Sequence, residues 1–472
     1  MPSHHGMKDF GGLAAYCRPA HARRRSDRFG RLCETLPPLY TDPNVLRDVG
    51  AKSGPMDGGT GNDRTDSVSV GMVFFGQFVD HDITLDVTSS FDSVNEADSI
   101  PNVRTPTLDL DSVYGGGPEA TPFLYHQTGD FHGVKLVTGA DTDGHDHAAS
   151  DLPRCEGVAL IGDPRNDENR VISQIHLAMI RVHNKMVDRL AAGDDPLSGH
   201  DLYAEARRQV TWHYQWNVVH DFLVAMCGQG VVNRVLSEGR RFYRPEEPYI
   251  PVEFAVAGFR FGHSMVPQEV QVRTGEAPRA LFGDILGGGF TPVSGPKAVV
   301  DMHEIFFTHE GRDVERAQRL DTNLARTLLD LPFIKEGETS LATRNLLRGQ
   351  SFLLPSGESF ARAVGRPEAE IDQVRAAVET ATGGTLTSGT PLWLYFLMEA
   401  EVVGREAANG SFEPAEGLGP AGATLVAETI VGLIELDPRS WLGTDRSWSP
   451  DREAADDERL DGIGNMLAWA QP

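Results

Sequence analysis

The sequence predicts a mainly α-helical fold with long connecting loops and little β structure. Apolar residues recur at helical spacing over several long segments, and stretches rich in Gly and Pro separate these segments. Long runs with the two-residue alternation of a half-buried strand are not evident, and no internal repeat is found. The 472 residues are enough for about three domains at roughly 150 residues each, so the size of the core is not limiting.

An irregular arm is predicted first, because residues 1 to about 65 are rich in Gly, Pro and Asp and show no sustained period. Apolar residues at helical spacing then predict a helix from Ser67 to Ile83, and a loop-rich stretch extends from Thr84 to Asn166. The later helices are predicted at Asn169–Ala192, Asp201–Val224, Val314–Leu331, Glu368–Thr382, Pro391–Glu406 and Gly422–Glu435.

The charge balance excludes one class of partner. The chain has 43 Lys and Arg against 68 Asp and Glu, which gives a formal net charge of -25. A charge of this sign and size repels phosphate backbones and anionic lipid headgroups. We therefore expect no nucleic-acid partner.

The cysteines and the N-terminal segment bear on where the protein is located. Cys17, Cys33, Cys155 and Cys227 are widely spaced and form no C-x-x-C pair, so neither a disulfide framework nor a zinc site is implied. The first ten residues are polar, and neither a Sec nor a twin-arginine signal is visible. No stretch approaches about 18 apolar residues, so we expect no membrane span. The default prediction is a cytoplasmic protein, with secretion by a non-classical route as the alternative.

Gln77 and His81 form the first candidate pair for chemistry. They are four residues apart, so on a helix they share a face and can present an amide and an imidazole to one pocket. The alternative is a histidine that serves only packing or solubility.

The loop from Thr105 to Asp111 is a candidate calcium site. Hydroxyls and carboxylates alternate with other residues in it, and calcium takes about 6 to 8 oxygen ligands. The alternative is a solvated polar loop. A second acid-rich stretch, in which Asp141, Asp143 and Asp146 lie beside His145 and His147, shows how common that alternative is.

Arg165 and Glu168 form a further candidate pair. They are three residues apart, just before the helix predicted from Asn169, and would project from the same side of its first turn. The alternative is a surface ion pair at a helix start, where the helix dipole favours acidic residues.

Arg260 and His263 repeat the three-residue spacing in an apolar setting. A neutral imidazole is a common iron ligand, and an arginine one turn away can hold a carboxylate of the same cofactor. Asn345, in the segment Arg344 to Arg348, can accept the outer N–H of a ligating histidine and fix its tautomer. Ordinary packing is the alternative for each of these residues taken alone.

Taken together and in this order, the five segments resemble the peroxidase-cyclooxygenase superfamily, which contains the animal haem peroxidases, and most closely its bacterial branch. The resemblance extends from about Ser67 to Trp441. Agreement of five segments in sequence order is far more specific than any one of them.

The resemblance implies a role for each distal and calcium-binding residue. His81 matches the distal base, Gln77 the distal amide and Arg165 the distal arginine. The residues that match the calcium ligands are Asp82, Thr105, Thr107, Asp109 and Asp111. Relatives often carry Ser at the position of Asp111, and one extra carboxylate is compatible with calcium.

The resemblance also implies how haem b is held. His263 matches the proximal iron ligand, Asn345 the residue that hydrogen-bonds it and Arg260 a partner of a haem propionate. Asp80 and Glu168 match two carboxylates that form ester bonds to haem methyl groups in some relatives, which raises the question of a covalent link here. Asn169 stands where one animal subgroup carries a Met that makes a third, sulfonium bond, so that bond is not expected.

The function that the resemblance implies is a haem peroxidase, which reduces hydrogen peroxide and oxidises a small electron donor through a ferryl intermediate. His81 would take a proton from one peroxide oxygen and return it to the other, while Arg165 stabilises the negative charge on the departing oxygen. The donor is a halide, thiocyanate or a phenol, and these residues do not select among them.

Two alternative functions are kept open. A haem-dependent fatty-acid dioxygenase of the same superfamily would need a tyrosyl radical near the haem, and position 260, three residues before the proximal histidine, is Arg. A non-enzymatic haem-binding protein would not need the full set of His81, Arg165 and Gln77.

Because one pocket would take residues from Gln77 to Asn345, we predict a single catalytic domain at 66–446, with an N-terminal arm (1–65) and a C-terminal tail (447–472).

Overall fold

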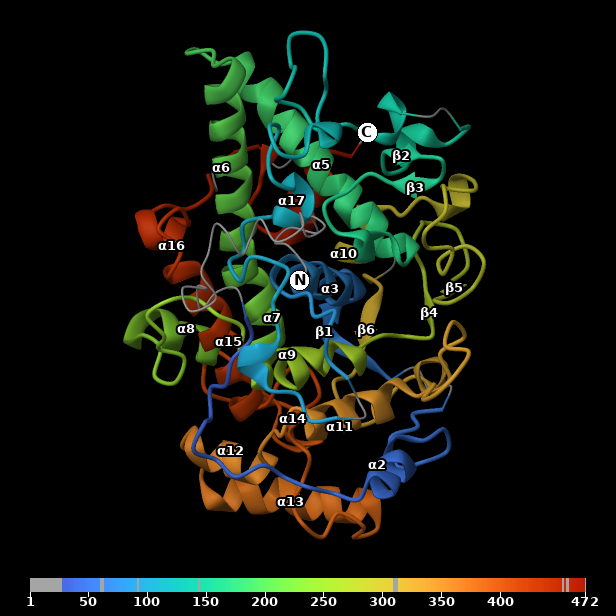
Figure 1. The fold of residues 1–472 in the computed structure, drawn as a ribbon, viewed down its shortest axis with the longest axis vertical. Helices are drawn as coiled ribbons and strands as arrows, with labels where there is room; N and C mark the ends of the chain where they lie inside the picture. The colour runs from blue at the N-terminus through green and yellow to red at the C-terminus, as the bar shows by residue number, and fades with distance from the viewer. Residues whose placement is uncertain are drawn as a thin grey trace.

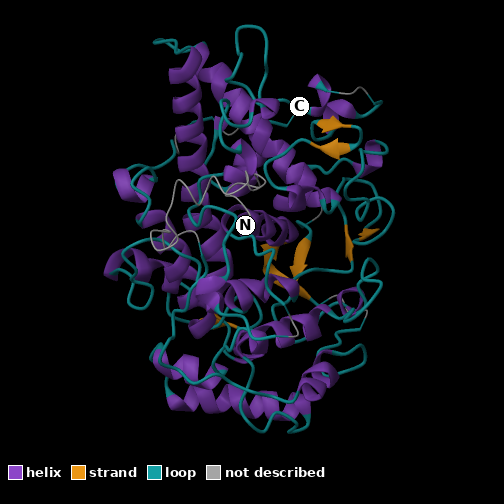
Figure 2. Cartoon of the chain, in the orientation of Figure 1, coloured by secondary structure: helices purple, strands orange, loops and turns teal. Residues whose placement is uncertain are grey.

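The chain is mainly helical with little sheet, as predicted (Figures 1 and 2). The computed structural model describes residues 28–59, 63–90, 93–142, 145–308, 313–451, 454–455 and 458–471. Cys17, Asp143 and the first part of the predicted arm lie outside these residues. No helix in the described ranges is both long enough and apolar enough to cross a membrane.

Three long helical segments form the centre of the molecule. α3 (Val70–Ile83) packs against α5 (Arg170–Ala191), and α5 packs along α6 (Gly199–Asn217). A π-helical turn, Val218–Phe222, continues α6 into α7 (Leu223–Cys227). α3 is almost wholly apolar apart from its last turns, so it is buried on most sides and presents its few polar side chains to interior sites.

The remaining helices surround this centre, with α12 and α13 at the lower end in Figure 1. Their bounds are α2 (Pro43–Gly50), α4 (Asp111–Tyr114), α8 (Gln229–Glu238), α9 (Val252–Val256), α10 (Met302–Phe306), α11 (Leu341–Ser351), α12 (Gly357–Ala363), α13 (Glu368–Thr382), α14 (Leu392–Val402), α15 (Pro420–Glu435), α16 (Trp441–Thr444) and α17 (Ile463–Trp469). Two 3-10 helices contribute to the candidate site: η8 (Pro164–Asp167) and η10 (Gly258–His263).

Sheet structure in the described residues consists of four antiparallel two-stranded ladders. They are β1 (Arg64–Ser69) with β6 (Arg316–Gln318), β2 (Arg154–Cys155) with β3 (Val158–Ala159), β4 (Glu269–Val270) with β5 (Arg279–Ala280), and β7 (Arg405–Glu406) with β8 (Phe412–Glu413).

The β1–β6 ladder corrects two of the predicted helices. The helix predicted from Ser67 begins at Val70, because residues up to Ser69 pair with β6. The helix predicted over Val314–Leu331 is wrong: this segment contains β6 and a single 3-10 turn, Arg326–Leu329. Its short apolar pattern fitted a helix, but pairing with a strand about 250 residues earlier decided the structure.

The helix predicted to extend to Glu406 ends at Val402. Gly404 adopts a φ of 89°, which is a left-handed conformation that glycine tolerates, and Arg405–Glu406 then form β7. The other predicted helices agree with α5, α6 with α7, α13 and α15 to within a few residues.

Both terminal regions pack onto the helical centre. In the predicted arm, α2 contacts α11, and Phe29 is buried. In the predicted tail, Ile463, Met466 and Leu467 of α17 are buried, and α17 contacts α5 and α10. The boundaries at residues 65 and 447 stay predictions, but the described parts on both sides of them share one hydrophobic core.

Candidate functional site

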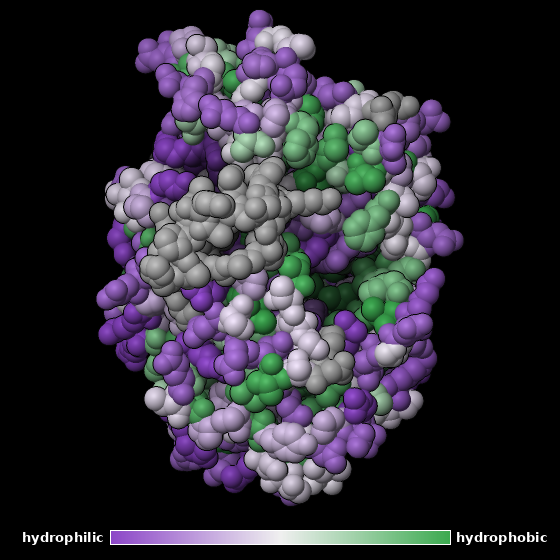
Figure 3. Space-filling view, viewed as in Figure 1, coloured by the Kyte–Doolittle hydropathy of each residue, from purple (hydrophilic) through white to green (hydrophobic). Residues whose placement is uncertain are grey.

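A cavity of about 500 Å³ lies between α3, η8, η10 and α11. All eight residues predicted for catalysis or cofactor binding line it: Gln77, Asp80, His81, Arg165, Glu168, Arg260, His263 and Asn345. Its volume is in the range typical of cofactor and small-molecule sites. Hydrophobic residues gather around a hollow to the right of centre in Figure 3. The structure therefore brings together side chains that are up to 268 positions apart, from 77 to 345.

His81 lies near the end of α3 with its side chain almost wholly buried, at 5% exposure. Burial, together with the positive charge of Arg165, lowers the pKa of His81 to about 3. The ring is therefore neutral at ordinary pH, which is the form that can accept a proton. Its Nδ1 lies 2.8 Å from Oδ1 of Asn166.

Arg165 is held by the side chain of Asp163. The Asp163 carboxylate caps η8 by accepting from the Arg165 backbone N–H, and it also accepts from the guanidinium Nε at 3.1 Å and from the terminal nitrogen at 2.8 Å. The same terminal nitrogen donates to the backbone oxygen of His81 at 3.1 Å. Burial alone would raise the pKa of Asp163, but the charge of Arg165 outweighs this effect and the pKa is lowered to about 2. A permanently ionised carboxylate thus fixes the guanidinium beside His81.

Gln77, Glu168 and Asp80 form a polar group on the cavity wall. Gln77 donates from Nε2 to the Glu168 carboxylate, and Thr84 donates to Asp80 Oδ1 at 3.0 Å. Burial raises the pKa of Glu168 to about 7, and it also raises the pKa of Asp80 against the opposing charge of Arg165. Glu168 is exposed and lines this cavity, and the surrounding protein still desolvates its carboxyl group.

His263 ends η10, and its ring is contacted by Asn345 of α11. Nδ2 of Asn345 lies 2.8 Å from Nδ1 of His263, while Oδ1 of Asn345 accepts from Arg260 at 3.2 Å. The amide nitrogen therefore faces the histidine, whereas the sequence predicts that the amide oxygen does. Arg260 can only donate, so it attracts the oxygen end of the amide. Burial, with the charge of Arg260, lowers the pKa of His263 to about 3, so this ring is also neutral.

Two further arginines, Arg344 and Arg348, line the same cavity as Arg260. Burial and the charge of Arg260 lower the pKa of Arg348 to about 10. Asp86 lies 3.5 Å from Arg348 and offsets part of this charge. Three guanidinium groups at one wall favour a ligand with carboxylates. The sequence motif contained both arginines, but nothing in it pointed to their place in the cavity.

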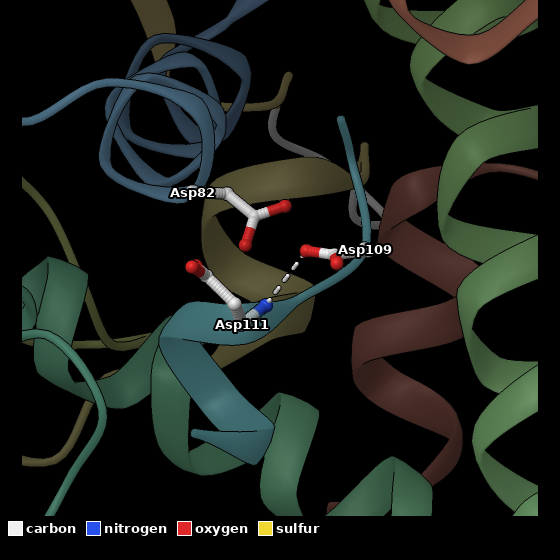
Figure 4. Close-up of side chains that lie close together, drawn as sticks. All are labelled: Asp82, Asp109 and Asp111. Atoms are coloured by element: carbon white, nitrogen blue, oxygen red, sulfur yellow. Dashed lines mark hydrogen bonds between the residues drawn. The ribbon is translucent and has the colours of Figure 1, made fainter. Parts of the chain in front are cut away.

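The carboxylates of Asp82, Asp109 and Asp111 form a second site. Asp82 extends from α3, Asp109 precedes α4 and Asp111 is the first residue of α4, so that the three groups face a common space (Figure 4). One oxygen from each lies within 4.8 Å of the others, and all three residues are buried. Burial and mutual repulsion raise the pKa values of Asp82 and Asp109. A solvated polar loop, the alternative for this segment, is therefore wrong.

The predicted threonines differ in their contacts with this cluster. Thr105 donates from Oγ1 to Asp109 at 2.7 Å, whereas Thr107 contacts Asp109 through its backbone oxygen, which accepts from the Asp109 N–H at 2.9 Å. The second acid-rich stretch, around Asp141 and His145, makes ion pairs with histidines. His145 lies 3.2 Å from Asp151, and Asp141 lies 3.6 Å from His126.

Arg104 joins the two sites and was not predicted. Its side chain is 1% exposed and lies 3.2 Å from Asp111 and 3.1 Å from Asp163. One guanidinium thus links the carboxylate cluster to the carboxylate that holds Arg165. Burial of three charged groups together requires this kind of pairing. A lone arginine in a loop carries no spacing pattern that would have revealed it.

Among the described residues, no tyrosine lines the cavity. Tyr243 and Tyr249, which precede the η10 segment in the chain, pack against each other. The Tyr243 hydroxyl donates to the Tyr249 backbone oxygen at 2.6 Å.

The residues of the cavity fit a haem. His263 offers iron a neutral nitrogen ligand, the three arginines suit propionate carboxylates, and apolar side chains such as Phe222, Phe259 and Leu281 can contact the ring. A Cβ added at Gly262 would meet no protein atom within 4 Å, so open space adjoins His263. The fold and this donor set together are those of a mainly helical protein whose cavity suits haem.

Residues 93–379 match the profile of the animal haem peroxidase family, which is more than half of the chain. The chain belongs to this family. The matched range contains Arg165, Glu168, His263 and Asn345, and begins after His81.

Curated relatives include mouse peroxidases. Eosinophil peroxidase of Mus musculus is 27% identical over 223 residues, which cover 44% of this chain and 29% of that protein. Myeloperoxidase of Mus musculus is 25% identical over 385 residues, which cover 74% of this chain and 49% of that protein. The chain thus spans less than half the length of these relatives.

Solved structures with the same fold include both peroxidases and dioxygenases. Peroxidase A from Dictyostelium discoideum has a TM-score of 0.60 and 15% identity, with 88% of each chain covered. A fatty acid alpha-dioxygenase from Oryza sativa has a TM-score of 0.58 and 15% identity, with 99% of this chain and 82% of that chain covered. At this identity the likeness shows the fold alone, so the choice between the two activities rests on the site.

Proposed function

We propose that this protein is a haem peroxidase that reduces hydrogen peroxide and oxidises a small donor such as a halide, thiocyanate or a phenol. The observation that carries the proposal is the meeting of His81, Arg165 and His263 at one cavity, with both imidazoles held neutral by burial. Three separate parts of the chain supply an acid–base group, a fixed positive charge and an iron ligand.

His263 would bind the iron, and Arg260, Arg344 and Arg348 would bind the propionates. The haem, when bound, supplies the redox chemistry. Its carboxylates would compete with Asn345 for Arg260, and release of the amide would let its oxygen turn to the Nδ1 side of His263. A side-chain amide has nearly the same shape in both orientations, so this turn needs no other movement.

The distal residues would divide the work on peroxide. His81 accepts the proton of one peroxide oxygen and returns it to the other as the O–O bond breaks. Arg165 stabilises the negative charge that develops on the departing oxygen, and Asp163 prevents the guanidinium from moving away. Gln77 lies at the same wall and would help to position water or a halide there.

The composition of the cavity wall favours peroxidase over fatty-acid dioxygenase. An oxygenase of this superfamily needs a tyrosine that can give an electron to the oxidised haem. Position 260 is Arg, and no described tyrosine lines the cavity. A guanidinium cannot serve as that radical. The complete distal set likewise argues against a protein that only binds haem.

We also propose that Asp82, Asp109 and Asp111 bind calcium, with Thr105 and Thr107 as further oxygen ligands. Three buried carboxylates within 4.8 Å of one another repel, and a cation between them would relieve the repulsion that Arg104, paired with Asp111, offsets only in part. Because His81 and Asp82 are adjacent on α3, a bound cation would also fix the position of the distal imidazole.

Absorption spectroscopy of the purified protein tests the proposal. A Soret band should be present, should shift when stoichiometric peroxide is added, and should return when a donor such as iodide or a phenol follows. Absence of haem, or a Soret band that peroxide only bleaches, would refute the proposal.

A further inference from the structure

Asn166 connects His81 to a second buried histidine. Oδ1 of Asn166 lies 2.8 Å from Nδ1 of His81, and Nδ2 lies 3.0 Å from Nδ1 of His176. The three side chains come from η8, α3 and α5, and their exposures are 0%, 5% and 0% in that order. Asn166 and His176 are therefore sealed from solvent, and the network is assembled from separate elements.

The amide oxygen decides where His81 carries its proton. A carbonyl oxygen can only accept a hydrogen bond, so Nδ1 of His81 must be the protonated nitrogen. A neutral imidazole has one N–H, and Nε2 is then left with a free lone pair. Nε2 has no hydrogen-bond partner among the described residues, and His81 lines the cavity. This is the proton arrangement that a distal base requires.

His176 lies at the other end of the Asn166 amide, 3.0 Å from its nitrogen. When His176 carries its proton on Nε2, its Nδ1 accepts from the Asn166 NH₂ group, and this contact holds the oxygen toward His81. A reversed amide would donate to Nδ1 of His81 and move the His81 proton to Nε2, where it would block the base. Phe78 packs edge-on against the His176 ring at a centroid distance of 6.1 Å and keeps the ring in place.

We propose that Asn166 and His176 are positioning residues, which keep the proton of His81 on Nδ1 and present Nε2 to the cavity as the base. The inference rests on the proposed function for its catalytic meaning, but the position of the proton can be measured separately. The charged groups that act on His81, which are Arg165, Asp163 and Arg104, stay unchanged in every variant below.

The first readout is the tautomer of His81. Ring nitrogen NMR of protein labelled with ¹⁵N-histidine reports which nitrogen carries the proton, in the diamagnetic carbon monoxide complex of the reduced holoprotein and equally in protein without haem. The His81 signals are assigned by their loss in His81→Gln. The parent should show Nδ1 protonated and Nε2 unprotonated. Asn166→Leu, which keeps the size of the side chain and removes both polar atoms, should give a mixture of tautomers.

The second readout is the rate of the absorbance change on adding peroxide. Asn166→Leu should lower this rate by about 10-fold or more. The loss is smaller than that expected on removing the base, because His81 remains and only its proton is misplaced in part of the molecules. His176→Phe leaves Asn166 in place but frees its amide to rotate, so it should also mix the tautomers and lower the rate. Asn217→Leu is the matched control, because Asn217 is equally buried and bonds instead to the segment around Leu460.

The outcomes separate this inference from the proposed function. A parent with Nε2 protonated, or an Asn166→Leu protein with unchanged tautomer and rate, overturns the inference. A parent with Nδ1 protonated that does not react with peroxide refutes the proposed function and leaves the proton assignment standing. Should Asn166→Leu not fold, the parent spectrum and His176→Phe decide the question.

Discussion

At His81, two physical effects act in the same direction. Burial and the charge of Arg165 together lower its pKa to about 3, so that the side chain stays an unprotonated base in a cavity that also holds fixed positive charge. Such a neutral base beside a charged guanidinium suits a reaction in which a proton moves and negative charge develops nearby.

Replacing His81 by Gln should slow the peroxide-driven absorbance change by about 100-fold or more, the usual scale for loss of a general acid–base group, while haem stays bound. Stopped-flow absorbance measures the rate. His213→Gln is the control, because His213 is a buried histidine that packs on Trp448 and does not line the cavity. Equal rates in His81→Gln and the parent would remove His81 from the distal role.

The carboxyl groups of Asp80 and Glu168 both line the cavity, which is the requirement for ester bonds to a haem. After several peroxide cycles, acid–acetone extraction should leave part of the haem on the protein. In the double variant Asp80→Asn, Glu168→Gln the haem should leave completely. Complete extraction from the cycled parent would show that neither carboxylate is linked.

At the scale of elements, α3 and the segment from Thr105 to Asp111 share one charged site. The end of α3 places His81 toward the cavity and Asp82 toward the carboxylate cluster, so the stability of this junction affects both sites. The Asp82 carboxylate already accepts two hydrogen bonds, from the Leu110 backbone N–H at 3.2 Å and from the Ser112 hydroxyl at 2.9 Å.

Removal of calcium should lower the melting temperature, because the clustered carboxylates then repel one another and the stabilisation from ligand binding is lost. Calorimetry with and without a chelator measures this, and metal analysis identifies the ion. Asp109→Ala should make the melting temperature insensitive to the chelator. A parent that contains no calcium and melts at the same temperature after exhaustive chelation would contradict the assignment.

Arg104→Leu should affect both sites at once, since its guanidinium contacts Asp111 and Asp163. We expect a lower melting temperature and a peroxide reaction slower by about 10-fold, because Asp163 would hold Arg165 less firmly. Arg104→Lys should recover only part of the loss, since an ammonium group cannot replace a planar guanidinium at two carboxylates. A slow reaction with no change in stability, or the reverse, would show that the two sites are not linked through Arg104.

At the scale of the whole molecule, the sequence was most informative where partners are close in the chain. Gln77 with His81 and Arg260 with His263 were recognised because helical spacing places such residues on one face. The order of these motifs then indicated the family. The helices α5, α13 and α15 followed from their long apolar periods.

What the sequence could not indicate depends on contacts between distant segments. Asn166 contacts a histidine 85 positions earlier, and Arg104 contacts Asp163, 59 positions later. Neither has a local pattern. The same cause produced the error over residues 314–331, where pairing with β1 overrode a short apolar pattern.

The proposed function requires that this cavity uses peroxide to oxidise small donors and does not oxygenate fatty acids. An oxygen electrode tests it most directly, with holoprotein, linoleate and a trace of peroxide, alongside a parallel sample with iodide or a phenol and stoichiometric peroxide. We predict no oxygen uptake with linoleate and oxidation of the small donor in proportion to the peroxide added. Steady oxygen uptake that yields lipid hydroperoxides would contradict the peroxidase assignment and favour the dioxygenase.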